Sequence, residues 1–329
     1  MQKFLQAPTT INIDKPLSKK APTGKTVIGL DSGLGSAKVL AKYWEQAAKD
    51  LGWTYKDIIS GTTPETQQKA FESALQQSPD GILTSGIPIS TLKSQLADAK
   101  SKGVWVNTSA STDAPSGAMF DTSIANPAQL AEWGKMVAAY VTVQSKGKAV
   151  IQDFSLPVFP ILVAFDKAFQ AGIKQWCPGC KVSEHAQQGT DIGTKTPQSV
   201  VSAVQANPKT DWLIFDLGNL ATGVDAALAA AGLAQGRHIG GLTADVPNLE
   251  SLKSKKEDVW TAYSLPVVGY RQVDSMARKF VGDPAVAASL PTQLITQDTV
   301  SGLKNDNAGN YVGVADYQTQ FKKLWQVGG

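Results

Sequence analysis

The sequence predicts an α/β fold made of two Rossmann-like lobes, each built on a parallel sheet. Between Lys25 and Asn107, short apolar runs alternate with helical patterns of roughly 12–16 residues. Helices of that length between strands make right-handed crossovers, so the strands run parallel and the sheet is covered on both faces. The alternation resumes beyond Asn126, and 329 residues suit two cores better than one.

The first set of elements follows from apolar runs and helical spacing. The expected strands are Thr26–Leu30, Thr54–Ile59, Gly81–Thr84 and Val104–Asn107. The expected helices are Ser36–Leu51, Pro64–Gln77 and Ser90–Lys102. Asn126 and Pro127 then look like a helix N-cap followed by a first-turn proline, which predicts a helix through about Ser145.

The second set repeats the alternation. The expected strands are Lys148–Gln152, Lys181–Gln187, Trp212–Phe215, Ile239–Leu242 and Val259–Ser264. The expected helices are Val158–Gln175, Pro197–Ala206, Leu220–Ala231, Pro247–Lys253 and Val268–Val281. The end of the chain is less regular, with a short apolar run at Gln293–Thr296 and a polar helix at Tyr317–Gln326.

Composition and charge narrow the class of protein. Apolar residues make up 42% of the chain and charged residues 18%, the balance of a folded soluble protein. The net charge of +3 is too small to indicate nucleic-acid binding. Only Arg237, Arg271 and Arg278 are arginines, which argues against an anionic substrate, because Arg is the usual clamp for carboxylate and phosphate. No apolar run reaches the roughly 18–20 residues of a membrane span.

Cys177 and Cys180 form a Cys-x-x-Cys pair with three interpretations. Redox catalysis needs the motif at a helix N-terminus after a strand, whereas here it follows a helical pattern and precedes a strand. A zinc site needs two more ligands, and neither His185 nor His238 has finger-like spacing. We therefore favour a small structural disulfide in an oxidising compartment, and we expect no metal.

The strand ends predict where a ligand binds. In parallel sheets the ligand crevice lies beyond the carboxyl ends of the strands, and ligands commonly sit where two lobes face each other. In the first set these ends carry Asp31, Ser32, Gly33, Ser85, Gly86, Asn107, Thr108 and Ser109. In the second set they carry Asp153, Phe154, Asp216, Asn219, Thr243 and Asp245. The first group is small, polar and mostly uncharged, which indicates ligand binding rather than covalent chemistry.

Enzyme motifs are absent or incomplete, so we expect no catalytic residue and no cofactor. The run from Gly33 to Lys38 begins like a dinucleotide-binding loop but lacks the third glycine. The sequence contains neither a phosphate-binding loop ending in Gly-Lys-Ser/Thr nor a Gly-x-Ser-x-Gly elbow. An oxidoreductase of the Rossmann type remains a weak alternative, which failure to bind nicotinamide cofactors would dismiss.

The N-terminus has no signal peptide, because the first five residues lack an adequate apolar core. Residues 6–24 are rich in Pro, Thr and Lys without any period, as in an extended arm or tether. We favour an exported protein whose leader has been removed, and the alternative is a cytosolic protein with a flexible start.

The chain resembles the type I periplasmic solute-binding proteins of ABC importers, in the branch that contains ribose- and other sugar-binding proteins. Four stretches carry the resemblance, and their order and spacing matter more than any one of them: KTVIGLDSGLGSAKVLAKYWEQAAKDLGW, DGILTSGI, GKMVAAYV and DLGNLATGVDAALAAAG. The resemblance covers about residues 25–300. It implies two lobes joined by a three-segment hinge, with an N-lobe at 25–123 plus 265–295. The C-lobe is then 124–264 plus 296–329, and residues 1–24 form the extended arm.

The resemblance also implies ligand positions. In the N-lobe they map to Asp31, Ser32, Ser36 and Ser109, and Asn126 is both a helix cap and a candidate contact. In the C-lobe they map to Asp153, Phe154, Phe159, Asp216, Asn219, Thr243 and Asp245. A hinge position that is often Gln maps to Ser264.

Two positions depart from the sugar-binding pattern. An Asp that grips sugar hydroxyls in the family maps near Ser109, and the helix that usually begins with a sugar-binding Arg maps to Leu156–Phe165, which has no charge. Each hydroxyl removed from water needs a partner, so fewer charged partners indicate a less hydroxylated ligand. Phe154, Phe159 and Phe165 would give such a ligand an apolar or aromatic surface.

The resemblance implies an extracytoplasmic monomer, not an enzyme, that captures a small sugar-like molecule between its lobes and delivers it to an ABC permease. It is either periplasmic or a cell-surface lipoprotein. One alternative is a binding protein for a less hydroxylated or aromatic molecule. Another is the effector-sensing core of a LacI-type repressor, which needs a DNA-binding helix-turn-helix ahead of residue 25, and the Pro/Lys-rich arm is not one.

Overall fold

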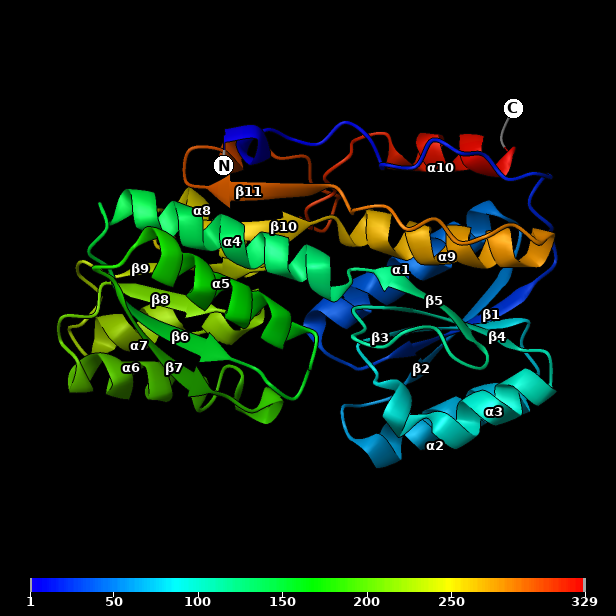
Figure 1. Ribbon diagram of the computed structural model, residues 1–329, viewed down its shortest axis with the longest axis horizontal. Coiled ribbons are helices and arrows are strands. Elements are labelled where there is room, and N and C mark those ends of the chain that lie inside the picture. Colours follow the sequence, from blue (N-terminus) through cyan, green and yellow to red (C-terminus); the bar gives the residue numbers. More distant parts are fainter. Residues whose placement is uncertain (1, 328–329) are drawn as a thin grey trace. The chain divides into compact units, whose positions relative to one another are not determined.

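The computed structural model describes residues 2–327 and consists of two compact α/β units (Figure 1). Residues 1, 328 and 329, which the predicted arm and tail include, lie outside the described part. We use N-lobe for the unit made of Thr9–Asn126, Ser264–Pro291 and Val314–Gly329. We use C-lobe for the unit made of Met1–Pro8, Pro127–Tyr263 and Thr292–Gly313.

The N-lobe is a five-stranded parallel sheet in the order β2-β1-β3-β4-β5. Its strands are β1 (Thr26–Asp31), β2 (Thr54–Ile59), β3 (Gly81–Ser85), β4 (Trp105–Ser109) and β5 (Met119–Ile124). Its helices are α1 (Gly35–Asp50), α2 (Pro64–Gln76), η2 (Ile89–Thr91), α3 (Lys93–Ser101), α9 (Leu265–Val281) and α10 (Tyr317–Trp325). Helices α1 and α9 cover one face of the sheet and α2 and α3 cover the other, while α10 packs on α9 (Figure 1).

Helix α2 shows how local sequence fixes this lobe. The Thr63 side chain accepts a hydrogen bond from the Thr66 N–H, and Pro64 occupies the first turn, so the helix starts where the sequence predicts. The buried stripe of α2 includes Phe71 and Leu75, which join Ile28 and Val106 of the sheet in one apolar cluster. Each large side chain buried there contributes roughly 1.5–3 kcal/mol.

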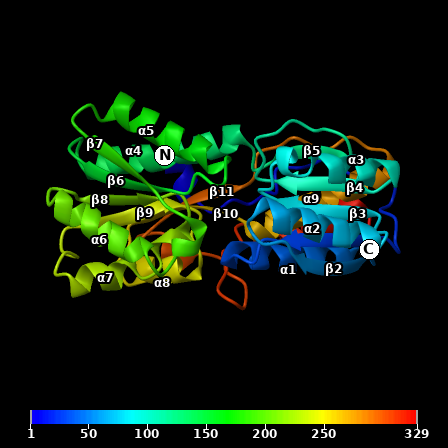
Figure 2. The same cartoon turned by 90° about the horizontal axis from the view of Figure 1, so that it is seen from below.

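The C-lobe is a six-stranded sheet in the order β11-β10-β9-β8-β6-β7. Its strands are β6 (Val150–Ser155), β7 (Lys181–Ala186), β8 (Trp212–Phe215), β9 (His238–Leu242), β10 (Val259–Tyr263) and β11 (Thr292–Thr296). Its helices are η1 (Gln2–Leu5), α4 (Pro127–Gln144), α5 (Leu162–Trp176), η3 (Gly189–Asp191), α6 (Thr196–Ala206), η4 (Gly218–Ala221), α7 (Val224–Ala230), α8 (Val246–Lys253) and η5 (Val300–Gly302). Helices α4 and α5 pack together on one face, and α6 and α7 lie on the other (Figure 2).

The close packing of α4 on α5 depends on Gly134. A Cβ atom at this position would overlap the backbone carbonyl oxygen of Phe165, so only glycine lets the two helices approach to this distance.

The predicted two-lobe α/β fold is confirmed, although some of the predicted strands and helices need correction. Strand β11 pairs antiparallel with β10, so the C-lobe sheet is mixed rather than wholly parallel. Helix α7 begins at Val224 rather than at Leu220, because Gly223 adopts a left-handed conformation (φ +79°) and separates it from η4.

The N-terminal segment is extended but packed, which corrects its prediction as a tether. Ile11, Leu17 and Ala21 are buried, and the Leu17 N–H donates to the carbonyl oxygen of Leu324 (2.9 Å). The Trp53 indole N–H also donates to the carbonyl oxygen of Pro22 (2.6 Å). Residues 9–24 therefore form part of the N-lobe.

The chain passes from one lobe to the other five times, after residues 8, 126, 263, 291 and 313, whereas the family resemblance implies three passages. Residues 1–8 belong to the C-lobe, where the Gln293 side-chain amide donates to the carbonyl oxygen of Leu5 (3.2 Å). The predicted C-lobe tail is divided, because residues 296–313 lie in the C-lobe and residues 314–329 in the N-lobe.

Candidate functional site

The N-lobe part of the site begins at Asp31, the last residue of β1. Asp31 is 2% exposed, and its Oδ1 accepts a hydrogen bond from the Gly33 N–H (2.7 Å). Gly33 has a φ of +84°, which turns the chain from β1 toward α1. Ser60, at the end of β2, donates to the Asp31 carbonyl oxygen through both its N–H (2.6 Å) and its hydroxyl (3.1 Å). Ser60 was not predicted as a contact, because its only signal in the sequence is its place after a strand.

Hydroxyl side chains gather at the neighbouring strand ends of the N-lobe. The Ser109 hydroxyl lies 3.0 Å from the Ser85 hydroxyl, which joins the ends of β4 and β3. Ser32 accepts a hydrogen bond from the Leu34 N–H (3.4 Å), and Ser36 is half-buried in the first turn of α1. Asp31, Ser32, Ser85 and Ser109 therefore lie at the strand ends of one edge of the N-lobe sheet, and their role as ligand contacts stays a prediction.

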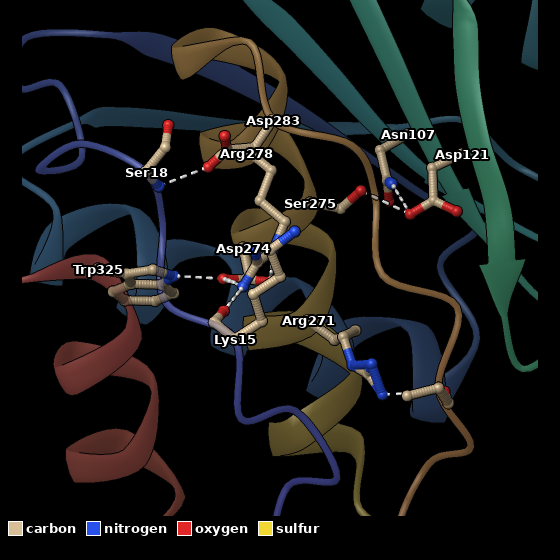
Figure 3. A network of polar contacts seen from close by, with 11 residues as sticks. Lys15, Ser18, Asn107, Asp121, Arg271, Asp274, Ser275, Arg278, Asp283 and Trp325 are labelled. Carbon is tan, nitrogen blue, oxygen red and sulfur yellow. Dashed lines mark hydrogen bonds and ion pairs between the residues drawn. The ribbon is translucent and has the colours of Figure 1, made fainter.

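Asn107 does not belong to this edge, although the sequence places it near a strand end. Its side-chain amide donates to the Asp121 carboxylate (3.2 Å), which also accepts from the Ser275 hydroxyl (2.5 Å) of α9 (Figure 3). Asn107 thus links the sheet to a covering helix.

In the C-lobe, three buried side-chain oxygens at adjacent strand ends have no hydrogen-bond partner among the described residues. They are Asp216 Oδ1 after β8, Asn219 Oδ1 in η4 and Thr243 Oγ1 after β9. The strand ends are held together, because the Gly218 N–H donates to the Thr243 carbonyl oxygen (3.1 Å). Unpaired buried acceptors are rare and call for an explanation, and a bound ligand is one.

Thr243 also has an unusual backbone. Its φ is +58°, although it is β-branched and only 4% exposed. A β-branched residue in the left-handed region is strained, and such strain clusters at functional sites. The sequence predicts Thr243 as a contact but contains no signal for this conformation.

Three other predicted contacts lie at helix starts. Asp245 caps α8 in a capping box with Asn248, and burial raises its pKa to about 6. Ser264 caps α9 by accepting a hydrogen bond from the Val267 N–H (3.1 Å). Asn126 directly precedes α4 and is half-buried. The caps of Asp245 and Ser264 give these two residues a structural role whatever else they bind.

Asp153 and Phe154 lie inside the C-lobe rather than beyond a strand. Strand β6 continues to Ser155, so both residues belong to the sheet and are fully buried. Phe154 stacks between His185 and Phe215, with ring centroids 5.1 Å from each. The prediction ended this strand at Gln152, whereas in the structure Asp153 lies within β6 and its carboxyl group is buried in the core.

Asp153 belongs to a buried cluster of acids between the sheet and α5. Burial, and then the neighbouring carboxylates, raise the pKa of Asp153 to about 7 and that of Asp166 to about 8, and burial holds the pKa of Asp216 well above its usual value. Gln170 donates to Asp153 (3.2 Å) and to Glu184 (3.1 Å). The cluster therefore carries protons near neutral pH.

The segment between β6 and α5 is apolar and partly exposed. Pro157 and Pro160 delay the start of α5 to Leu162, so Phe159 lies in a turn rather than in the predicted helix. Val158 is 51% exposed and Phe159 is partly buried. Val158 was not predicted as a contact, although Pro157 and Pro160 on either side of it indicate an exposed turn.

Only one of the three predicted aromatic contacts keeps an accessible side chain. Phe165 is fully buried in α5 and stacks on Phe169 at 6.3 Å between ring centroids, and Phe154 is buried as described above. An aromatic lining of the site therefore rests on Phe159 alone.

No group of three or more His, Cys, Asp or Glu side chains in residues 2–327 is arranged to hold a metal ion. Cys177 and Cys180 form the predicted disulfide in the turn between α5 and β7, with Cα atoms 5.3 Å apart. Among the described helices, none is both long and apolar enough to cross a membrane.

Comparison with known proteins gives one sequence match and many structural matches. Residues 36–284 match the sequence profile of the periplasmic binding protein domain. No curated protein sequence matches the chain.

Two solved structures illustrate the likeness in fold. The 5-methylthioribose transporter solute-binding protein of Thermotoga lettingae has a TM-score of 0.77 at 16% identity, over 95% of this chain and 99% of that one. The arabinose-binding component from Shewanella sp. ANA-3 has a TM-score of 0.76 at 17% identity, over 92% and 99%. At such identities the likeness establishes the two-lobed fold and leaves the ligand open.

Proposed function

Because the chain belongs to the periplasmic binding protein family, we propose that it captures a small, uncharged, sugar-like solute outside the cytoplasm and delivers it to an ABC permease. The strand-end residues of both lobes would supply the contacts. In this role the chain is a monomer and not an enzyme, and whether a lipid anchor holds it at the cell surface is a separate part of the proposal.

The observation that carries the proposal is the set of unpaired oxygens of Asp216, Asn219 and Thr243. A buried polar group without a partner costs roughly 1–3 kcal/mol, so a ligand that supplies the missing hydrogen bonds gains that energy on binding. Sugar hydroxyls suit these positions because each of them both donates and accepts. In the N-lobe, the hydroxyls of Ser85 and Ser109 would make hydrogen bonds of the same kind.

The charges of the C-lobe support an uncharged ligand. Burial raises the pKa values of Asp153, Asp166 and Asp216, and the strand-end residues named above include no Arg or Lys that could pair with an anion. Sugar acids and sugar phosphates should therefore bind far more weakly than the matching neutral sugars.

The structural neighbours support the class of ligand. Several similar structures hold a bound sugar or polyol, among them a solute-binding protein from Burkholderia graminis with D-arabinose and one from Agrobacterium vitis with allitol. The DNA-binding alternative receives no such support, and the packed N-terminal segment is not a helix-turn-helix.

A second candidate is a sugar with an apolar substituent. It is favoured by the exposed side chain of Val158 and the partly exposed one of Phe159, both next to Leu156, whose N–H donates to Asp216 Oδ2 (2.6 Å). A deoxy or alkylthio sugar would place its apolar group against this turn and its hydroxyls against Asp216.

The test is a titration calorimetry panel of aldopentoses, hexoses, polyols, deoxy and alkylthio sugars, and the acid derivatives of the best hits. We expect saturable binding of at least one neutral compound, and Asn219→Ala should weaken it about tenfold, the effect of one lost hydrogen bond. Asn307→Ala, an exposed asparagine of the same lobe, is the matched control and should bind normally. Binding only of acids, or unchanged binding by Asn219→Ala, would contradict the proposal.

A further inference from the structure

The C-lobe contains a cavity at the edge of its sheet opposite to the strand-end residues of the candidate site. Its volume is about 310 Å³, which is within the range of small-ligand pockets. It lies between α7, the start of β9 and the turn before β10, whereas Asp216 and Thr243 lie at the carboxyl ends of β8 and β9. A ligand there would not overlap the strand-end site of the same lobe.

Positive charge dominates the wall of this cavity. Arg237, Lys255 and Lys256 line it together with a single carboxylate, that of Asp225. Asp225 is already paired with Lys256 (3.1 Å). No ion pair found among residues 2–327 includes Arg237 or Lys255, so two cations face the cavity without a carboxylate of their own.

Arg237 is held in place at the cavity wall. Its Nη2 donates to the carbonyl oxygen of Pro208 (3.2 Å), which fixes the plane of the guanidinium group. Its Nε is buried and has no acceptor among the described residues. A guanidinium group that is held by one hydrogen bond and still has N–H groups to donate is preorganised to bind a carboxylate or phosphate.

The floor of the cavity is apolar. Leu228 is 1% exposed and Ile239 3%, and alanines of α7 and of the turn at Ala234 complete the lining. The cations of the wall and the apolar floor together suit a ligand with an anionic group at one end and a short hydrocarbon chain.

We propose that this cavity binds a small aliphatic carboxylate, with its carboxylate group on Arg237 and Lys255 and its hydrocarbon chain over Leu228 and Ile239. The proposal is independent of the sugar-binding function, because the two sets of residues share no member. It gives the C-lobe a second ligand of different chemistry from the first, since the strand-end residues offer hydroxyl, amide and carboxyl groups whereas this cavity offers two cations.

Methyl-labelled NMR of the full chain tests the proposal, with butyrate as the probe and butyramide as its neutral counterpart of similar size. We expect butyrate to shift the methyl signals of Leu228 and Ile239 in a saturable manner, and butyramide to leave them unchanged. The double variant Arg237→Gln/Lys255→Gln should weaken butyrate binding about tenfold or more. Lys148→Gln, an exposed lysine of the same lobe with no side-chain ion pair among those found, is the matched control.

Equal shifts by butyramide, or equal affinity in the double variant, would overturn the proposal. A sugar titration of the same samples separates this result from the proposed function. We expect the double variant to keep its affinity for the sugar, because Arg237 and Lys255 lie outside the strand-end site. The methyl spectrum itself shows that the variant is folded, so loss of butyrate binding cannot be mistaken for unfolding.

Discussion

Replacing Arg278 by Met should destabilise the N-lobe by about 3–5 kcal/mol, the cost of leaving a buried charge without its partner. Arg278 is 1% exposed and Asp274 is fully buried, and their side chains are joined at 2.8 Å within α9 (Figure 3). The Arg278 guanidinium also donates to the carbonyl oxygen of Lys15 (2.8 Å), and the Trp325 indole N–H donates to Asp274 (2.9 Å). The Arg278–Asp274 ion pair therefore links both the N-terminal segment and α10 to α9.

The magnitude follows from what remains after the substitution. Asp274 keeps only the hydrogen bond from Trp325, and its pKa, already raised by burial and lowered by Arg278, should rise further. Asp274→Leu should cost at least as much, because the buried Arg278 guanidinium cannot lose its charge, whereas an unpaired aspartate can take up a proton. The double variant Arg278→Met/Asp274→Leu should recover most of the loss, since an apolar pair of similar volume is often as stable as a buried ion pair.

The assay is urea unfolding combined with hydrogen exchange of the α9 amides, which reports on the N-lobe alone. The matched control is Lys102→Met. Lys102 and Asp98 have the same i,i+4 spacing and the same 2.8 Å separation as the buried pair, but their side chains are 49% and 48% exposed. The control should cost no more than about 0.5 kcal/mol. A loss below about 1 kcal/mol for Arg278→Met, or a double variant no better than that single one, would refute the reasoning.

Three further predictions concern the C-lobe. The raised pKa values of Asp153 and Asp166 mean that the folded lobe holds protons that the unfolded chain has lost, so its free energy of unfolding should fall as the pH rises from about 4 to about 8. In urea titrations at several pH values, Asp166→Asn should make this pH dependence weaker. An unchanged pH dependence would exclude the acid cluster as its source. Gly241→Ala should unfold or severely destabilise the lobe, because the φ of Gly241 is +154° and a Cβ atom would overlap a backbone oxygen of β8. Thermal melting measures this, and a normal melting temperature would disprove the prediction. Replacing Cys177 and Cys180 by Ser should cost at most about 2 kcal/mol, because the closed loop is short, and a larger loss in denaturant would show that the turn needs the disulfide for more than loop closure.

The sequence predicted the fold well where local signals and the overall topology agree. The helix that follows Asn126 and the helix that starts at Pro64 both begin at a proline in the first turn, which needs no partner elsewhere in the chain. The alternation of apolar runs with helices then determines the parallel order of most strands. The pairing of β11 with β10 was not predictable in this way, because an antiparallel edge strand carries the same apolar pattern as a parallel one.

The candidate site was only partly predictable. Asp31, Asp216 and Thr243 lie at strand ends, as the pattern indicates. Phe154 was misplaced because β6 runs three residues further than its apolar pattern, and the side chain that follows Asp153 then turns into the core. The unpaired oxygens themselves carry no sequence signal, since whether a buried hydroxyl or amide finds a partner depends on packing between distant segments.

The five passages of the chain between lobes set the order in which the protein is able to fold during its synthesis. The N-lobe sheet is complete at residue 126, but the side chain of Gln272 in α9 bonds to Trp44 (2.9 Å) and to the carbonyl oxygen of Thr84 (2.9 Å), and α10 covers α9. At ribosomal speeds of roughly 5–20 residues per second, the remainder of the chain takes about 10–40 s to emerge. During that interval α1 covers its part of the sheet but α9 is missing, so the apolar surface that α9 buries is open to aggregation or to a chaperone.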